Sequence, residues 1–141
     1  MTIAVKRVYE APAARDGLRV LVDRLWPRGL TKELAAVKHW LRDLAPSTEL
    51  RQWYHANPEA WSSFRKRYLK ELASAEGSAA LEKLYRLARS SKRLTLLFAS
   101  RNEERNNATV LKELLEGARK PPSSVGRATP GRGRIGRSKR Q

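Results

Sequence analysis

The sequence predicts an α/β protein in which a small, largely parallel sheet of three strands is flanked by about five helices. Three stretches are aliphatic enough to be strands, at residues 2–9, 18–22 and 93–100. The second and third are apolar on nearly both faces, which is typical of strands that are covered on both sides. Segments with helical spacing of apolar residues separate these two strands, and a helical crossover joins parallel strands. We therefore expect the second and third strands to end at the same edge of the sheet.

Five helices are expected from capping residues and apolar spacing. Thr31 is a suitable N-cap for the first helix and Ser47 for the second. Asn102 is the expected N-cap of the last helix, because the two glutamates after it would then lie in the first turn, where the helix dipole favours negative charge. The expected helices cover about residues 31–44, 48–56, 58–75, 78–90 and 102–117.

The 141 residues carry a formal net charge of +16, and this excess is divided between two regions. Residues 117–141 hold eight Lys and Arg and no acidic residue, whereas residues 1–116 hold 22 basic against 14 acidic side chains. The change in composition divides the chain into an α/β domain, 1–117, and a basic tail, 118–141, which is rich in Pro, Gly and Ser and which we predict to be disordered.

The composition also limits the environment of the protein. The chain has no cysteine, so disulfide bonds and thiolate chemistry are excluded. The N-terminal segment lacks an apolar run of signal-peptide length, and no later segment approaches the roughly 20 apolar residues of a membrane span. We therefore expect a cytoplasmic protein that does not bind a membrane.

Polar residues follow both of the buried strands. Asp23, Arg24 and Arg28 come after strand 18–22, on a segment that turns at a Pro and a Gly. The candidates after strand 93–100 are Ser100, Arg101, Asn102, Asn106 and Asn107. Arginines beside the free N–H groups of a helix N-terminus form a pocket that suits a phosphate or a carboxylate. We therefore predict that an anionic, phosphate- or nucleotide-like small molecule binds at the carboxyl ends of these strands.

Simpler roles for the same residues stay open. Asp23 and one arginine could form a structural ion pair that ties a strand to a helix. Trp26 is expected to pack against the core rather than to stack on a ligand. Asn106 and Asn107 have poor helix propensity, so they could bind a ligand, lock the Pro-Arg-Gly loop that follows strand 18–22 or simply be tolerated at the surface.

The residues leave open whether the chain is an enzyme. Ser100 is a possible nucleophile, but no histidine stands near it in the sequence to activate it. Asp23 is a weak candidate for an acid or base. His39 and His55 do not have metal-ligand spacing, so we predict no metal site and no cofactor.

Nucleic-acid association is the alternative function. The helix expected at 58–75 combines aromatic and basic residues, although the spacing of its aromatic residues favours core packing. The tail could bind nucleic acid without sequence preference, by release of counterions. Its candidate residues are Arg132, Arg134, Arg137, Lys139 and Arg140. A scaffold that binds another protein is a third possibility.

Four segments of the sequence resemble the small, YeaO-like branch of the DUF488 family. They are Val-Lys-Arg-Val-Tyr at 5–9, Val-Leu-Val-Asp-Arg-Leu-Trp-Pro-Arg-Gly at 20–29, Leu-Ala-Pro-Ser-Thr-Glu-Leu at 44–50 and Leu-Leu-Phe-Ala-Ser-Arg-Asn-Glu-Glu-Arg-Asn-Asn-Ala at 96–108. The resemblance covers about residues 3–116 and implies a small cytoplasmic α/β protein. The family is named for having no assigned function, so the resemblance implies no activity.

This chain departs from the family pattern in its last motif. The longer branch usually has a Cys-His pair there, in the register of Asn106 and Asn107, and the small branch commonly reads Asp-Glu-Glu-His-Asn. Here Asn102 and Arg105 stand in place of the acid and the histidine. A thiol or imidazole mechanism therefore does not carry over to this chain, and Asp23 and two glutamates are the acid-base candidates that remain.

Overall fold

Four parallel strands form one sheet in the order β1-β4-β2-β3. The structure is a computed structural model, and it describes residues 2–117. The strands are β1 (Thr2–Arg7), β2 (Leu18–Leu21), β3 (His39–Trp40) and β4 (Arg93–Phe98). β4 is central, with Leu96 opposite Val5 of β1 on one side and opposite Val20 of β2 on the other. Because all pairs are parallel, the strands begin at one edge of the sheet, the amino edge, and end at the other, the carboxyl edge.

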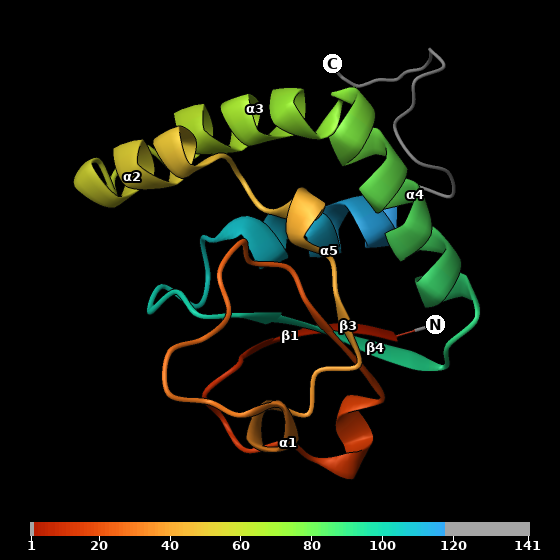
Figure 1. Cartoon of the computed structure of the whole chain (residues 1–141). Coiled ribbons are helices and arrows are strands. Elements are labelled where there is room, and N and C mark those ends of the chain that lie inside the picture. The colour runs from red at the N-terminus through yellow and green to blue at the C-terminus, as the bar shows by residue number, and fades with distance from the viewer. Residues whose placement is uncertain (1, 118–141) are drawn as a thin grey trace.

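Helices cover both faces of this sheet. They are α1 (Lys32–Ala35), α2 (Thr48–Ala56), α3 (Trp61–Leu72), α4 (Ala75–Arg89) and α5 (Asn107–Gly117), with single 3-10 turns η1 (Ala14–Asp16) and η2 (Arg42–Leu44). In Figure 1, α2 to α5 lie above the sheet, whereas α1 lies below it. None of the helices in residues 2–117 is long and apolar enough to cross a membrane.

The two layers bury two separate apolar cores. Successive residues of a strand point to opposite faces, so neighbouring side chains enter different cores. Leu96 of β4 packs in the larger core with the helices α2 to α5, while the next residue, Leu97, packs in the smaller core on the α1 side. Val20 and Leu21 of β2 divide in the same way. Burial on both faces explains why these strands are apolar along nearly their whole length.

Local capping sets the starts of two helices on the larger face. The Ser47 hydroxyl accepts a hydrogen bond from the Leu50 N–H at 3.1 Å, as the sequence predicted for α2. Ser74 caps α4 in the same way, by accepting from the Gly77 N–H at 3.1 Å. The expected helices at 58–75 and 78–90 are confirmed as α3 and α4, but they meet at Ser74 rather than at residues 77–78.

The prediction of three strands and of a helix through residues 31–44 is wrong. Thr31 does cap α1, but the helix ends after Ala35 because Ala36 takes a left-handed conformation, with φ at 50°. The chain then forms β3 beside β2, with a hydrogen bond of 2.9 Å from the Lys38 N–H to the Arg19 carbonyl. A fourth strand therefore extends the sheet where the periodic pattern predicted a helix.

The predicted disordered tail, with its candidate nucleic-acid residues, lies outside the described residues. It includes Arg132, Arg134, Arg137, Lys139 and Arg140.

Candidate functional site

Asp23 lies at the carboxyl edge, two residues after the end of β2, and its carboxylate is held by the backbone after β4 and by the start of α5. Its Oδ2 atom accepts a hydrogen bond from the Ala99 N–H at 2.8 Å, just beyond the end of β4. Its Oδ1 atom accepts from Asn107 Nδ2 at 3.1 Å, at the start of α5. The same Asn107 nitrogen donates to the Val22 carbonyl at 2.9 Å. These contacts bring the ends of β2 and β4 and the start of α5 to one place, as the sequence predicted for Asp23 and Asn107.

Burial raises the pKa of Asp23 above its ordinary value. The hydrogen bonds from Ala99 and Asn107 and the positive charge of Arg51 act in the opposite direction but do not cancel the effect of burial. Asp23 therefore takes up a proton more readily than an exposed aspartate does. This property suits an acid-base group, although it also follows from a purely structural position.

Arg24 follows Asp23, and only some of its hydrogen-bond donors have partners within the described residues. Its Nη2 atom donates to the Ala45 carbonyl at 3.4 Å. Its Nε atom is buried, and it is the one buried side-chain nitrogen or oxygen in residues 2–117 that has no hydrogen-bond partner. The ion pair of Asp23 with an arginine, which the sequence left open, is not formed, because within the described residues Asp23 is held by N–H groups and makes no salt bridge.

Arg28 is exposed, and the loop that carries it is held by Tyr9, which lies two residues beyond the end of β1. The Tyr9 hydroxyl donates to the Arg28 carbonyl at 3.0 Å, and the Arg7 guanidinium lies 5.2 Å from the centre of the Tyr9 ring. Arg7 also donates to the carbonyls of Ala99 and Ser100, both at 3.0 Å. Arg7 was not among the predicted site residues. An arginine near the end of the expected strand 2–9 was the available signal, since parallel neighbours end at the same edge of the sheet.

Trp26 packs in the smaller core, as predicted. Its ring meets that of Trp40 edge-on with centroids 5.4 Å apart, and its Nε1 atom donates to the Leu30 carbonyl at 2.6 Å. The Trp40 Nε1 atom in turn donates to the carbonyl of Asp23 at 2.7 Å. The tryptophans therefore hold the segment after β2 in place.

The segment between β4 and α5 is an exposed loop rather than a helical turn, so the prediction of Asn102 as the N-cap of α5 is wrong. Asn102 instead orders the loop, since its Oδ1 atom accepts from the N–H groups of Glu104 and Arg105 at 3.1 and 2.9 Å. Ser100 and Arg101 are exposed beside it, and the Ser100 hydroxyl accepts from the Asn102 N–H at 3.1 Å.

Asn106 is the residue that caps α5. Its Oδ1 atom accepts from the Thr109 N–H and the Thr109 hydroxyl accepts from the Asn106 N–H, both at 3.1 Å. Its Nδ2 atom donates to the Asn102 carbonyl at 2.7 Å. Within residues 2–117, no polar contact joins Asn106 to Arg28, so the structure does not show these two candidate residues acting together.

The carboxyl edge thus combines a half-buried carboxylate, a half-buried arginine whose buried Nε atom has no partner within residues 2–117, and an exposed arginine. Within residues 2–117 there is no group of three His, Cys, Asp or Glu side chains that could hold a metal ion. The fold and this edge define the class: a parallel α/β protein with a polar site at the ends of its strands.

The chain belongs to the DUF488 family. Residues 2–128 match a family model that is described as the inactive DUF488-N3 subclade. The chain is 46% identical over 115 residues to uncharacterised proteins of Mycobacterium bovis and Mycobacterium tuberculosis, a match that covers 82% of this chain and 94% of each relative. It is 43% identical over 117 residues to the uncharacterised protein YeaO of Escherichia coli, covering 82% of this chain and 97% of YeaO. No solved structure matches the chain.

Proposed function

We propose that this protein binds an anionic small molecule, phosphate- or nucleotide-like, at the carboxyl edge of its sheet. The buried Nε atom of Arg24, which has no partner within residues 2–117, carries the proposal. Buried polar groups are nearly always hydrogen-bonded, and an oxygen of a ligand that reaches this donor would satisfy it. An oxygen of a phosphate or carboxylate is a strong acceptor for a guanidinium donor.

The charges at this edge favour an anion. Arg28 is exposed after β2, and its side chain makes no ion pair within the described residues. The loop after β4 is balanced, because it carries Arg101 and Arg105 together with Glu103 and Glu104. The excess positive charge therefore comes from the segment after β2, where Arg28 would supply the second contact.

Binding is better supported than turnover. The chain has no cysteine. Within the described residues the Ser100 hydroxyl accepts from the Asn102 N–H and donates to no histidine or carboxylate. The description of the matching subclade as inactive agrees with this reading. Asp23 would orient the segment that carries the arginines, or it would accept a hydrogen bond from a hydroxyl of the ligand.

A thermal-shift screen of phosphate, nucleotides and sugar phosphates tests the proposal. A ligand present at 100 times its dissociation constant should stabilise the folded protein by about 2.7 kcal/mol. Arg24→Met and Arg28→Ala should each weaken binding of at least one compound that gives a shift, while the control Lys66→Ala, an exposed lysine on α3, should bind as the parent does. Unchanged binding in both arginine variants would refute the assignment of this site.

Nucleic-acid association is the second candidate, and one observation favours it. The guanidinium of Arg67 on α3 lies 4.2 Å from the centre of the Trp53 ring, with the exposed Lys70 one turn further on. The surface groove here, of about 580 Å³, is also lined by Glu49 and Glu71, and these acids disfavour a polyanion. As the sequence indicated, the aromatic residues of α3 pack in or against the larger core.

Fluorescence anisotropy with duplex DNA and with RNA separates the two candidates. The test compares the parent with a full-length chain in which serine replaces the five basic candidates of the tail, and with Arg67→Glu. Loss of all binding in the tail variant would assign nucleic-acid binding to the tail and leave the domain for the small molecule. Binding that survives the tail change and is abolished by Arg67→Glu would favour α3 as a nucleic-acid surface.

A further inference from the structure

A basic cavity of about 610 Å³ lies at the amino edge of the sheet, opposite the candidate site. We name it the amino-edge cavity. Four chain segments form it: η1, the start of β2, the link from α1 to β3 and the link from α4 to β4. Its lining residues are Ala14, Arg15, Gly17, Leu18, Arg19, Ala36, Lys38, Ser91, Lys92 and Arg93.

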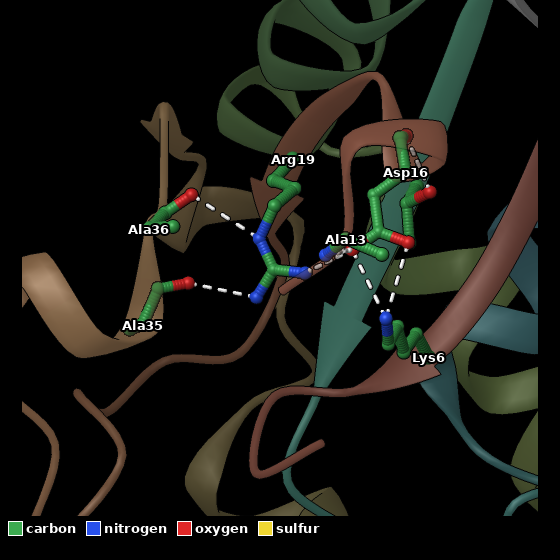
Figure 2. Close-up of polar contacts among 7 residues, drawn as sticks. Lys6, Ala13, Asp16, Arg19, Ala35 and Ala36 are labelled. Atoms are coloured by element: carbon green, nitrogen blue, oxygen red, sulfur yellow. Dashed lines mark hydrogen bonds and ion pairs between the residues drawn. The ribbon is translucent and has the colours of Figure 1, made fainter. Parts of the chain in front are cut away.

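A buried ionic network holds the walls of this cavity. Figure 2 shows Asp16 receiving hydrogen bonds from Lys6 and from the Ala13 N–H, and the Arg19 guanidinium lying against the same carboxylate. The Arg19 Nη1 atom is 2.6 Å from Asp16 Oδ2, and both side chains are almost fully buried. The rest of the Arg19 guanidinium donates to the last carbonyls of α1, those of Ala35 at 2.7 Å and Ala36 at 3.2 Å.

η1 is also fixed directly onto β4. The Thr95 hydroxyl donates to the Asp16 carbonyl at 2.7 Å. Gly17 has φ at 66°, and a Cβ atom at this position would lie 2.3 Å from the Arg93 carbonyl oxygen. A glycine is therefore required for η1 to approach β4 so closely. The cavity is a rigid feature of the fold rather than a gap between loose segments.

The charge in the cavity is uncompensated. Arg19 is neutralised by Asp16, but the other basic residues of the lining are exposed and form no ion pair within residues 2–117. These four are Arg15, Lys38, Lys92 and Arg93. The lining contains no acidic residue. Four positive charges from three segments thus line one open space, and they raise the local concentration of anions there.

We propose that the amino-edge cavity binds an organic phosphate with two or more negative charges, of the nucleoside diphosphate class. The cavity is open to solvent, and its volume lies in the range of small-molecule sites. The lysines and arginines would hold the phosphates, while Ala14, Leu18 and Ala36 offer an apolar surface to the organic part. This site is separate from the one proposed at the carboxyl edge, and neither depends on the other.

Isothermal titration calorimetry of the full-length protein with ADP, and separately with inorganic pyrophosphate, tests the inference. The test variant is Lys38→Ala with Lys92→Ala. The matched control is Lys66→Ala with Lys83→Ala, which removes the same charge from exposed lysines of α3 and α4. The cavity variant should bind ADP at least tenfold more weakly than the parent, while the control should stay within twofold. All four lysines are exposed, so both variants should keep the parent's melting temperature.

Three results would overturn the inference. They are no heat of binding for ADP or pyrophosphate, equal loss in the cavity variant and its control, and unchanged affinity in the cavity variant. Arg24→Met distinguishes the two sites: it should leave the ADP binding that depends on Lys38 and Lys92 unchanged. If ADP binding instead depends on Arg24 alone, the carboxyl-edge proposal is supported and the amino-edge inference is rejected.

Discussion

Asp16→Asn is the most informative single change in this fold. It keeps the volume of the side chain but removes the charge that faces Arg19 at 2.6 Å. Breaking a buried ion pair by removing one partner typically costs about 3–5 kcal/mol, because the other charge stays buried. Arg19 keeps its hydrogen bonds to the carbonyls of Ala35 and Ala36, so we expect the lower end of that range, about 3 kcal/mol at pH 7.

The same substitution has a pH signature. Burial alone would raise the pKa of Asp16, but hydrogen bonds from the Ala13 N–H, Lys6 and Arg19 lower it below its ordinary value of 3.8. The carboxylate therefore stabilises the folded state fully above about pH 4, and this contribution is lost as the pH falls through the lowered pKa. The Asp16→Asn variant should therefore lose less stability than the parent as the pH falls.

Urea unfolding at a series of pH values between 7 and 2.5 measures both effects. The matched control is Glu82→Gln, which removes a carboxylate from an exposed pair with Arg86 at 3.7 Å and should change the free energy of unfolding by less than about 0.5 kcal/mol. A loss below about 1 kcal/mol for Asp16→Asn at pH 7, or a stability difference from the parent that does not shrink in acid, would refute the reasoning.

Three further changes test other parts of the account. Asn107→Ala removes a hydrogen bond that lowers the pKa of Asp23 and should raise that pKa further; a carboxyl NMR titration that shows a lower or unchanged value would contradict this. Asn106→Ala should cost about 1 kcal/mol of unfolding free energy through loss of the α5 cap, and no loss would show that the cap is unimportant. Gly17→Ala places a Cβ atom 2.3 Å from the Arg93 oxygen at positive φ and should cost about 2 kcal/mol or more in thermal unfolding, whereas a neutral result would mean that the contact relaxes freely.

Much of the fold could be predicted because strand burial and helix caps act locally. β2 and β4 stand out as aliphatic runs, since both faces are buried, and Ser47 marks the start of α2 through its own side-chain contact. The missed strand β3 has two residues and carries no such signal. It forms because Arg19 binds the last carbonyls of α1 and because β2 has a free edge, and both causes come from distant parts of the chain.

Part of the candidate site could also be predicted, because the topology of a parallel sheet brings the ends of its strands together. Parallel topology was enough to place Asp23 near Asn107, because both follow neighbouring strand ends. The separate role of Asn106 as a cap depends on Thr109 three residues later, a local pattern that could have been recognised. The importance of Arg19 could also have been recognised, because a charged residue within a buried strand needs a partner, and Asp16 stands three residues before it.

Whether an anion binds the buried Nε–H of Arg24 can be followed through the resonance of that group in a ¹H–¹⁵N spectrum. Because pyrophosphate is also expected at the amino-edge cavity, the titration uses the variant with Lys38→Ala and Lys92→Ala. As inorganic pyrophosphate is added, we expect the Arg24 resonance to shift and to saturate at the affinity that calorimetry gives for this variant, while the Nε–H of Arg67, which lies over Trp53, stays in place. No binding to this variant, or binding that leaves the Arg24 resonance in place, would show that the anion does not bind at Arg24.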